Sequence, residues 1–158
     1  MTPPAASGAP VYAPPRLPGS AAPVTAPVPT PAAPASGGGV LSVADRAALP
    51  FVIDLPQGYD LVRGRPGGDF EVYSVQHAGR SLVMIYAGPS SQFPIYSGQT
   101  AQLGDRVSVV VDEDGRRRAM EHLFERRSAP REIHVWVATV APGEADVAER
   151  IAQSVDPR

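Results

Sequence analysis

The stretch DFEVYSVQHAGRSLVMIYA, residues 69–87, decides the fold class. Two runs rich in β-branched and aromatic residues flank Ala78-Gly79, which places glycine where a two-residue hairpin turn needs a positive φ. Both faces of the predicted strand pair are largely apolar, which is typical of central strands covered on both sides. The turn predicts these cross-strand pairs: His77 with Arg80, Val75 with Leu82, Tyr73 with Met84, Glu71 with Tyr86, Ser74 with Val83, Val72 with Ile85 and Phe70 with Ala87.

A second hairpin signal stands at Asp114-Gly115, between RVSVVVDE and RRRAMEHLFE. The alternative is a helix over 117–126, because several apolar residues there also share a helical stripe. We favour the strand, since it places acids opposite arginines and so accounts for more residues. The predicted pairs are Glu113 with Arg116, Asp112 with Arg117, Val110 with Ala119 and Val109 with Met120.

Further elements follow from the same patterns. FVIDL (51–55), YDLVR (59–63) and REIHVWVATV (131–140) are predicted strands, and PGEADVAERIAQSV (142–155) is a predicted amphipathic helix. Near the start of the domain, LSVADRAAL predicts one helical turn with Ser42 as its N-cap. The expected fold class is α+β: an antiparallel sheet of about five to six strands, covered on one face by the C-terminal helix.

Residues 1–40 differ in composition from the rest of the chain. They hold eleven prolines, ten alanines and five glycines, and Arg16 is their only charged residue. Such a segment has too few large apolar groups to offset the entropy cost of ordering. We predict a disordered, proline-rich tether over 1–40 and a single domain over 41–158. The tether is either an inert spacer or a ligand for a partner.

Charge and composition exclude several classes of function. Residues 41–158 hold all 16 acidic residues and 13 of the 14 basic ones, a net charge of −3 that argues against nucleic-acid binding. The chain has no cysteine, which excludes disulfides and thiolate sites. No apolar run approaches the about 20 residues of a membrane span, and the N-terminus lacks the pattern of a signal peptide. We therefore expect no membrane insertion by this chain.

A long loop is predicted over residues 88–104, and the stretch YAGPSSQFPIYSG (86–98) leads into it and forms its first part. Loops of this length in compact domains are often functional, and prolines limit its freedom. Either its aromatic residues cover the second face of the hairpin, or they serve a partner. The candidate partner-binding residues are Tyr73, Tyr86, Phe93, Ile95 and Tyr96.

The order of elements resembles PsbP-like and DcrB-like α/β sandwiches over about residues 50–156. The motifs are a first strand that enters a Leu-Pro-x-Gly-aromatic turn at 55–59 and a final helix that ends in Ile-x-x-Ser-Val at 151–155. The resemblance concerns fold, and such folds host unrelated roles. It implies a binding or assembly subunit and carries over no catalytic residue.

Few residues suggest chemistry. His122 and His134 share a face in one possible strand register, where they would form a metal or acid–base pair, while a slip of one residue separates them. Arg116, Arg117 and Arg118 form a weak candidate anion site, with paired surface arginines as the alternative. The spacing of the histidines does not match a zinc site, so we expect no metal, no cofactor and no catalytic residue.

These observations favour a non-enzymatic binding or assembly domain on a proline-rich tether, as a subunit of a bacterial envelope complex. The recognition surface would be the 88–104 loop. One alternative is a small metal-binding protein or hydrolase that uses His122 and His134. Another is a structural subunit whose tail is the interacting element. The tether favours the envelope or periplasm over the cytoplasm, because such spacers often join an anchor to a domain.

Overall fold

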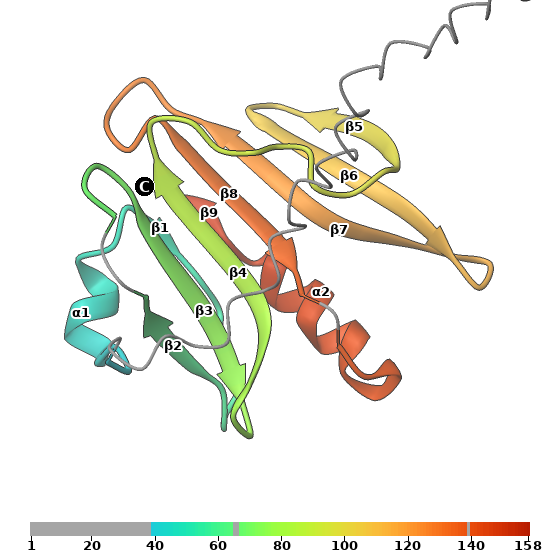
Figure 1. Cartoon of the computed structure of the whole chain (residues 1–158), viewed down its shortest axis with the longest axis horizontal. Helices are drawn as coiled ribbons and strands as arrows, with labels where there is room; N and C mark the ends of the chain where they lie inside the picture. Colours follow the sequence, from blue (N-terminus) through green and yellow to red (C-terminus); the bar gives the residue numbers. More distant parts are fainter. Residues whose placement is uncertain (1–38, 65–66, 139) are drawn as a thin grey trace, which may run out of the picture. The chain divides into compact units, whose positions relative to one another are not determined.

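The computed structural model describes residues 39–64, 67–138 and 140–158. An antiparallel sheet is the largest structural element of this part of the chain (Figure 1). The expected tether lies, up to residue 38, outside the described residues. The elements are α1 (Val43–Ala47), β1 (Phe51–Val52), β2 (Asp60–Arg63), β3 (Glu71–His77), β4 (Arg80–Gly88), β5 (Gln99–Leu103), β6 (Arg106–Glu113), β7 (Arg116–Glu125), β8 (Glu132–Val137), the 3₁₀ turn η1 (Pro142–Glu144), α2 (Ala145–Gln153) and β9 (Asp156–Pro157).

The main sheet has seven strands in the order β2-β3-β4-β8-β7-β6-β5, and β1 and β9 form a separate pair. The strand count is therefore larger than the five to six expected. The additional strand is β5, which lies inside the segment predicted as a loop. The predicted strand 51–55 is a strand only at Phe51 and Val52, and it pairs with the C-terminal end of the chain and not with the main sheet.

Both predicted hairpins are present. Their turns have positive φ at both central residues: 50° and 76° at Ala78 and Gly79, and 49° and 74° at Asp114 and Gly115. These angles fit the turn type that matches the twist of paired strands. Residues 117–125 are strand, so the helical alternative is wrong.

The register of the first hairpin departs from the prediction beyond the two pairs nearest the turn. His77 lies opposite Arg80 as expected, and Gln76 opposite Ser81, but a bulge between Val75 and Gln76 shifts the pairs beyond them by one residue. Val75 therefore lies opposite Val83 rather than Leu82, and Tyr73 lies opposite Ile85. The bulge has a packing cause, because it turns Val83 and Ile85 toward the core, where both are fully buried. The corrected pairs for the other predicted positions are Ser74 with Met84, Val72 with Tyr86 and Glu71 with Ala87.

The second hairpin also contains a bulge. The pairs nearest the turn are confirmed, including Glu113 with Arg116, Asp112 with Arg117 and Val110 with Ala119. Beyond them Val109 lies opposite Glu121 instead of Met120. The extra residue brings a charged side chain to a position that the prediction gave to methionine.

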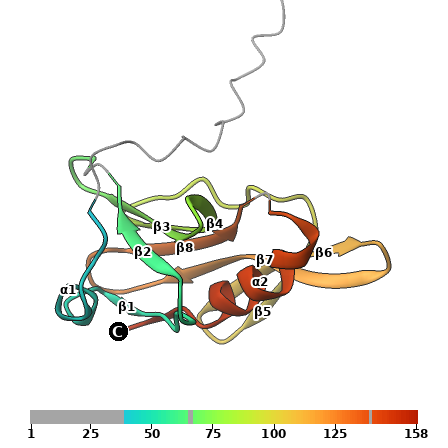
Figure 2. The ribbon, with the colours of Figure 1, turned by 90° about the horizontal axis from the view of Figure 1, so that it is seen from below.

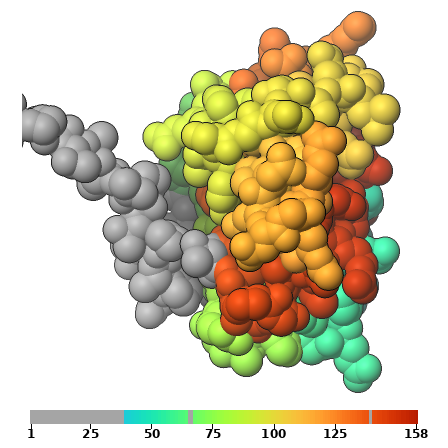
Figure 3. Space-filling model, turned by 90° about the vertical axis from the view of Figure 1, so that its right-hand side faces the viewer, coloured from blue at the N-terminus to red at the C-terminus, as the bar shows by residue number. Residues whose placement is uncertain are grey.

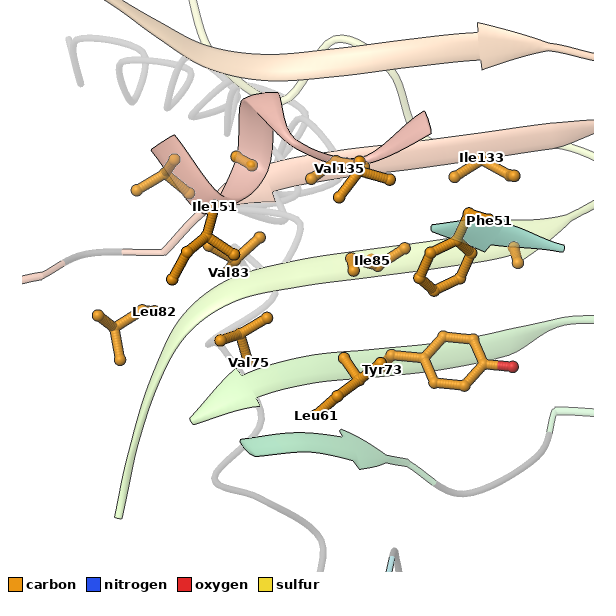
Figure 4. Packing of buried hydrophobic residues seen from close by; sticks show 14 of the residues in the cluster. Phe51, Leu61, Tyr73, Val75, Leu82, Val83, Ile85, Ile133, Val135 and Ile151 are labelled. Atoms are coloured by element: carbon orange, nitrogen blue, oxygen red, sulfur yellow. The ribbon is translucent and has the colours of Figure 1, made fainter. Parts of the chain in front are cut away.

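The sheet separates two groups of side chains. We call the surface that carries Tyr73, Ile85 and Val135 the helix face, and the surface that carries Tyr86 and His134 the loop face. Figure 2 shows α2 and the β1–β9 pair on one side of the sheet and the segment after β4 on the other. The helix face holds the hydrophobic core (Figure 4), to which α2 contributes Ala148, Ile151 and Ala152, with Val155 just beyond its end.

The predicted caps and stripes are confirmed where the chain is described. Ser42 and Asp45 form the reciprocal capping box of α1. Phe51 is fully buried on the helix face and packs edge-on against Tyr73, with ring centroids 5.4 Å apart. The short β1–β9 pair therefore closes the end of the core that α2 leaves open.

Candidate functional site

Residues 89–98, which we call the covering loop, lie across the loop face between β4 and β5 (Figure 1). Bonds to β4 and β8 hold its start. The Tyr86 hydroxyl donates to the carbonyl of Ser90 (2.6 Å), and the Ser91 N–H donates to the carboxylate of Glu132 (2.6 Å). The geometry thus matches the alternative in which the loop covers the second face of the sheet.

A buried carboxylate holds the middle of the loop. Glu121 on β7 is 0% exposed and its partner His134 on β8 is 1% exposed. Oε1 of Glu121 lies 2.5 Å from Nε2 of His134 and accepts the N–H of Ile95 (2.7 Å), while Oε2 accepts the N–H of Tyr96 (2.9 Å). Two backbone amides of the loop thus share one anionic acceptor beneath it.

The ionisation state of Glu121 follows from this environment. Burial by itself would raise the pKa of the Glu121 carboxyl, but the hydrogen bonds from His134 and from the two loop amides lower that pKa below its usual value. An ionised carboxylate only accepts hydrogen bonds, so Nε2 of His134 carries the proton that they share. The pair is a structural anchor for the loop, with all three contacts directed at the carboxylate.

Aromatic side chains complete the contact. The Phe93 ring meets the His134 ring edge-on, with centroids 5.5 Å apart, and the Trp136 ring lies tilted against His134 with centroids 4.8 Å apart. The Tyr96 hydroxyl donates to the carbonyl of Val137 (2.5 Å). Burial, and then the charge of Glu121, raises the pKa of Tyr96. Phe93, Tyr96 and Trp136 are all half-buried, and the register with β4 places Trp136 on the loop face.

The loop enters β5 through Gly98. A Cβ at this position would collide with the backbone carbonyl of Val110 and lie 2.9 Å from the side chain of Val109. Only glycine lets the chain pass this close to β6. The loop is therefore fixed at its start, middle and end.

Part of the loop still faces outward. Ile95 is 44% exposed although its amide is bonded to Glu121. Phe70 is also exposed, and it stacks on Tyr86 with ring centroids 5.5 Å apart. Exposed apolar groups on a fixed backbone form a surface that needs no ordering before it contacts a partner.

A cleft of about 800 Å³ borders the loop at the tip of the β6–β7 hairpin. Tyr96, Arg116 and Arg118 all line this cleft, so the structure brings together two of the predicted surfaces. Apolar residues from β7, from β8 and from the segment after it also line the cleft: Met120, Val137, Ala138 and Val140.

Tyr73 does not join this surface. The bulge in the first hairpin places it on the helix face, where it is 1% exposed. Burial, and then its hydrogen bond to Glu71, raises the pKa of Tyr73 to about 12. The predicted set of Tyr73, Tyr86, Phe93, Ile95 and Tyr96 is thus divided, with the last four on the loop face.

His122 and His134 do not form a shared site. They lie on opposite faces of the sheet, because His122 pairs with Val135 and His134 pairs with Leu123. His122 Nδ1 lies 2.7 Å from the hydroxyl of Ser108, and its Nε2 is buried with no hydrogen-bond partner among the described residues. Burial, and then the charge of Arg106, lowers the pKa of His122 to about 4. Among the described residues, no group of three histidines or acids is placed to hold a metal ion.

Two of the three arginines at the start of β7, Arg117 and Arg118, form ion pairs within the chain. Arg117 lies 3.8 Å from Asp112. Arg118 lies 2.8 Å from Asp146 and 3.3 Å from Glu149, both on α2. These pairs reduce the positive charge available to an anion, and the two pairs of Arg118 join the β6–β7 hairpin to the helix.

Comparison with protein-family models, with curated proteins and with solved structures finds no match for this chain. The resemblance to PsbP-like and DcrB-like sandwiches therefore stays a hypothesis that rests on its short motifs. Among the described residues, no helix is long and apolar enough to cross a membrane.

Sequence reasoning missed Glu121, the residue on which the loop depends. The available signal was a single acid inside the otherwise apolar run AMEHLF, residues 119–124. A charge in a strand of this kind needs partners when it is buried. Without the bulge at Met120, the predicted register gave no reason to place this acid under the loop.

Proposed function

We propose that the chain is a non-enzymatic binding or assembly domain on a proline-rich tether, a subunit of a bacterial envelope complex. Its recognition surface is the outward side of the covering loop together with the adjoining cleft. One observation carries the proposal: the loop presents an exposed isoleucine while its own backbone is bonded to a buried carboxylate.

The arrangement suits recognition of a protein segment. A loop that is already ordered pays less conformational entropy on binding than a free one. The exposed side chain of Ile95 gains by leaving water, at roughly 25 cal/mol for each Å² of apolar surface buried. The cleft next to Tyr96 offers apolar walls, and its lining also includes Arg116 and the acidic residues Asp112, Glu113 and Asp114, which suits an apolar side chain flanked by polar groups.

The two alternatives are less well supported. A metal-binding protein or hydrolase that uses His122 and His134 would need both rings at one site, and the rings lie on opposite faces. A titration with zinc, followed by the chemical shifts of both imidazoles, tests this alternative directly. The second alternative assigns the interaction to the tail, and deletion of residues 1–38 tests it.

The experiment is capture of partners from an envelope extract with four versions of the full chain: wild type, Ile95→Ser, Val52→Ser and the deletion of 1–38. Val52 is 42% exposed and lies on β1, outside the loop, so it is a matched control for Ile95. We expect Ile95→Ser alone to lose the partner while its melting temperature stays unchanged. Equal capture by wild type and Ile95→Ser would refute the surface, and loss only in the deletion would assign the interaction to the tail.

A further inference from the structure

The two edges of the main sheet differ in whether another segment pairs with them. The β2 edge is covered by residues 39–41: Leu41 donates to the carbonyl of Leu61 (2.8 Å) and Arg63 donates to the carbonyl of Gly39 (3.2 Å). β5 forms the other edge. Within the described ranges, no segment pairs with its outer side.

β5 also lacks the usual protection of an edge strand. Native proteins protect such edges with charged residues, proline or bulges. The sequence of β5 is QTAQL, which carries no charge and no proline, and its pairing with β6 runs without a shift. All five residues are exposed, and Leu103 is 71% exposed. Figure 3 shows the yellow atoms of this part of the chain at the surface.

The hydrogen-bonding groups that β5 presents can be assigned from its turn. The two residues Gly104 and Asp105 connect β5 to β6, and the φ of Gly104 is +61°. The pair that closes a two-residue hairpin, here Leu103 with Arg106, exchanges both of its hydrogen bonds, and such pairs alternate along the strand.

It follows that Thr100 and Gln102 direct their N–H and C=O groups away from β6. The backbone hydrogen bonds that described residues form outside the sheet ladders do not involve either residue. β5 therefore offers two donors and two acceptors in the plane of the sheet.

We propose that β5 pairs with β5 of a second copy of this chain, antiparallel and centred on Ala101. In this register Thr100 lies opposite Gln102 of the second copy, so the free groups of each strand satisfy those of the other. The two Ala101 residues meet at the closely spaced pair on the dyad axis, where a small side chain fits. The proposal does not depend on the function of the covering loop.

Charge also favours a second copy as the occupant. No like charges face each other along the strands, because β5 has none. At each end, Leu103 lies opposite Gln99 of the second copy, and Asp105 follows in the turn. The Gln99 side chain is held by Arg117 (2.7 Å), which places that guanidinium near Asp105 of the other copy. The arrangement therefore directs a basic residue, and not a second acidic one, toward Asp105 at both ends of the strand pair.

The test uses charge exchange on the full chain. Thr100→Asp/Gln102→Asp places acids opposite acids across the dyad, and Thr100→Lys/Gln102→Lys does the same with bases. Ala44→Asp/Gln57→Asp is the control, since both positions are exposed and neither lies on β5. Mass is measured by sedimentation velocity over a wide range of protein concentration.

We expect wild type and the control to double in mass as concentration rises, while each charged variant keeps the mass of one chain. An equimolar mixture of the acidic and basic variants should regain the doubled mass. A wild type that stays monomeric at every concentration overturns the proposal, and so does a dimer that survives in both charged variants.

A second measurement does not depend on the variants folding. Amide hydrogen exchange of wild type should slow at Thr100 and Gln102 as the protein is concentrated, and it should stay constant at Ala101, whose amide already faces β6. Exchange at Thr100 and Gln102 that does not change with concentration, in a protein that does dimerise, would place the interface elsewhere and refute the strand pairing.

Discussion

Replacing Glu121 by glutamine tests whether the carboxylate holds the covering loop. The carboxylate accepts three hydrogen bonds, from His134 and from the amides of Ile95 and Tyr96. Glutamine keeps the shape of the side chain but offers a single acceptor oxygen. In either orientation of the amide group, at least one loop N–H loses its acceptor and faces another donor.

The expected loss of stability follows from the number of hydrogen bonds that the variant loses. A buried donor left without a partner costs about 1–3 kcal/mol, and the remaining bonds lose the strength that the negative charge gives them. We therefore expect Glu121→Gln to lower the free energy of unfolding by about 2–4 kcal/mol. Denaturation with urea gives this value, and amide exchange at Ile95 and Tyr96 reports the loop itself. Both amides should exchange faster in the variant.

The control is Glu125→Gln, which lies on the same strand with its side chain exposed. It should change neither the stability nor the two amides. Acid gives a second check, because the pKa of Glu121 is lowered in the folded protein. The ionised Glu121 therefore adds to the free energy of unfolding above the unfolded pKa of 4.5, and this stabilisation is lost as the pH falls through the lower pKa of the folded protein. If Glu121→Gln left both the stability and the exchange of the loop amides unchanged, the carboxylate would not be the anchor.

Three further predictions concern other parts of the fold. Between pH 6.5 and about 4, the unfolded chain binds a proton at His122 that the folded chain does not, so the free energy of unfolding should decrease by about 3 kcal/mol as the pH falls through this range. Urea titrations at several pH values measure this decrease, and His122→Gln should remove it. Gly98→Ala should lower the melting temperature, because its Cβ has no room against Val110, whereas Gly79→Asn at the open hairpin turn should have little effect in the same thermal scan. Trp136→Ala should cost less than the about 3–5 kcal/mol of a fully buried aromatic residue, and the fluorescence of Trp136 should respond to Glu121→Gln, since both lie under the loop; a full core penalty without that response would contradict the placement.

Sequence reasoning located the hairpins because their signal is local. Ala78-Gly79 and Asp114-Gly115 need positive φ, and the residues that tolerate it are few. The predicted cross-strand registers were wrong beyond the bulges, because a bulge has no comparable local signal in the sequence. Leu82 is the extra residue in β4, and its cost is offset by the burial of Val83 on the helix face, which only the assembled core determines.

β5 was missed for a different reason. Glutamine and alanine have weak strand propensity, and the side chains of QTAQL are all exposed, so no apolar alternation marks the strand. The strand exists because β6 provides a ladder of partners for it. The Gly104-Asp105 turn was the available signal, since glycine followed by aspartate between two runs is a known hairpin connection.

The candidate site was predicted in part. The aromatic content of 86–98 identified the loop, because large apolar groups in a long loop must either cover something or meet a partner. The sequence could not predict that Tyr73 lies on the other face of the sheet from the remaining four residues, because the bulge in the first hairpin determines its face. The same holds for Glu121, whose partners come from β8 and from a loop about 25 residues earlier in the chain.

The two proposed surfaces belong to one continuous segment and still face different directions. The covering loop passes through Gly98 directly into β5, so the chain from 89 to 103 is fixed first by Glu121 and then by the β6 ladder. Ile95 points away from the sheet on the loop face, whereas Thr100 and Gln102 bond within its plane. An antiparallel pair of edge strands has its dyad perpendicular to the sheet, and this puts both covering loops on the same side of the dimer. Two copies of the recognition surface side by side would bind a repeated or dimeric partner more tightly than one copy does. Ile95→Ser should therefore abolish capture without changing the mass of the protein, and the charged β5 variants should change its mass while each chain keeps its single-site binding.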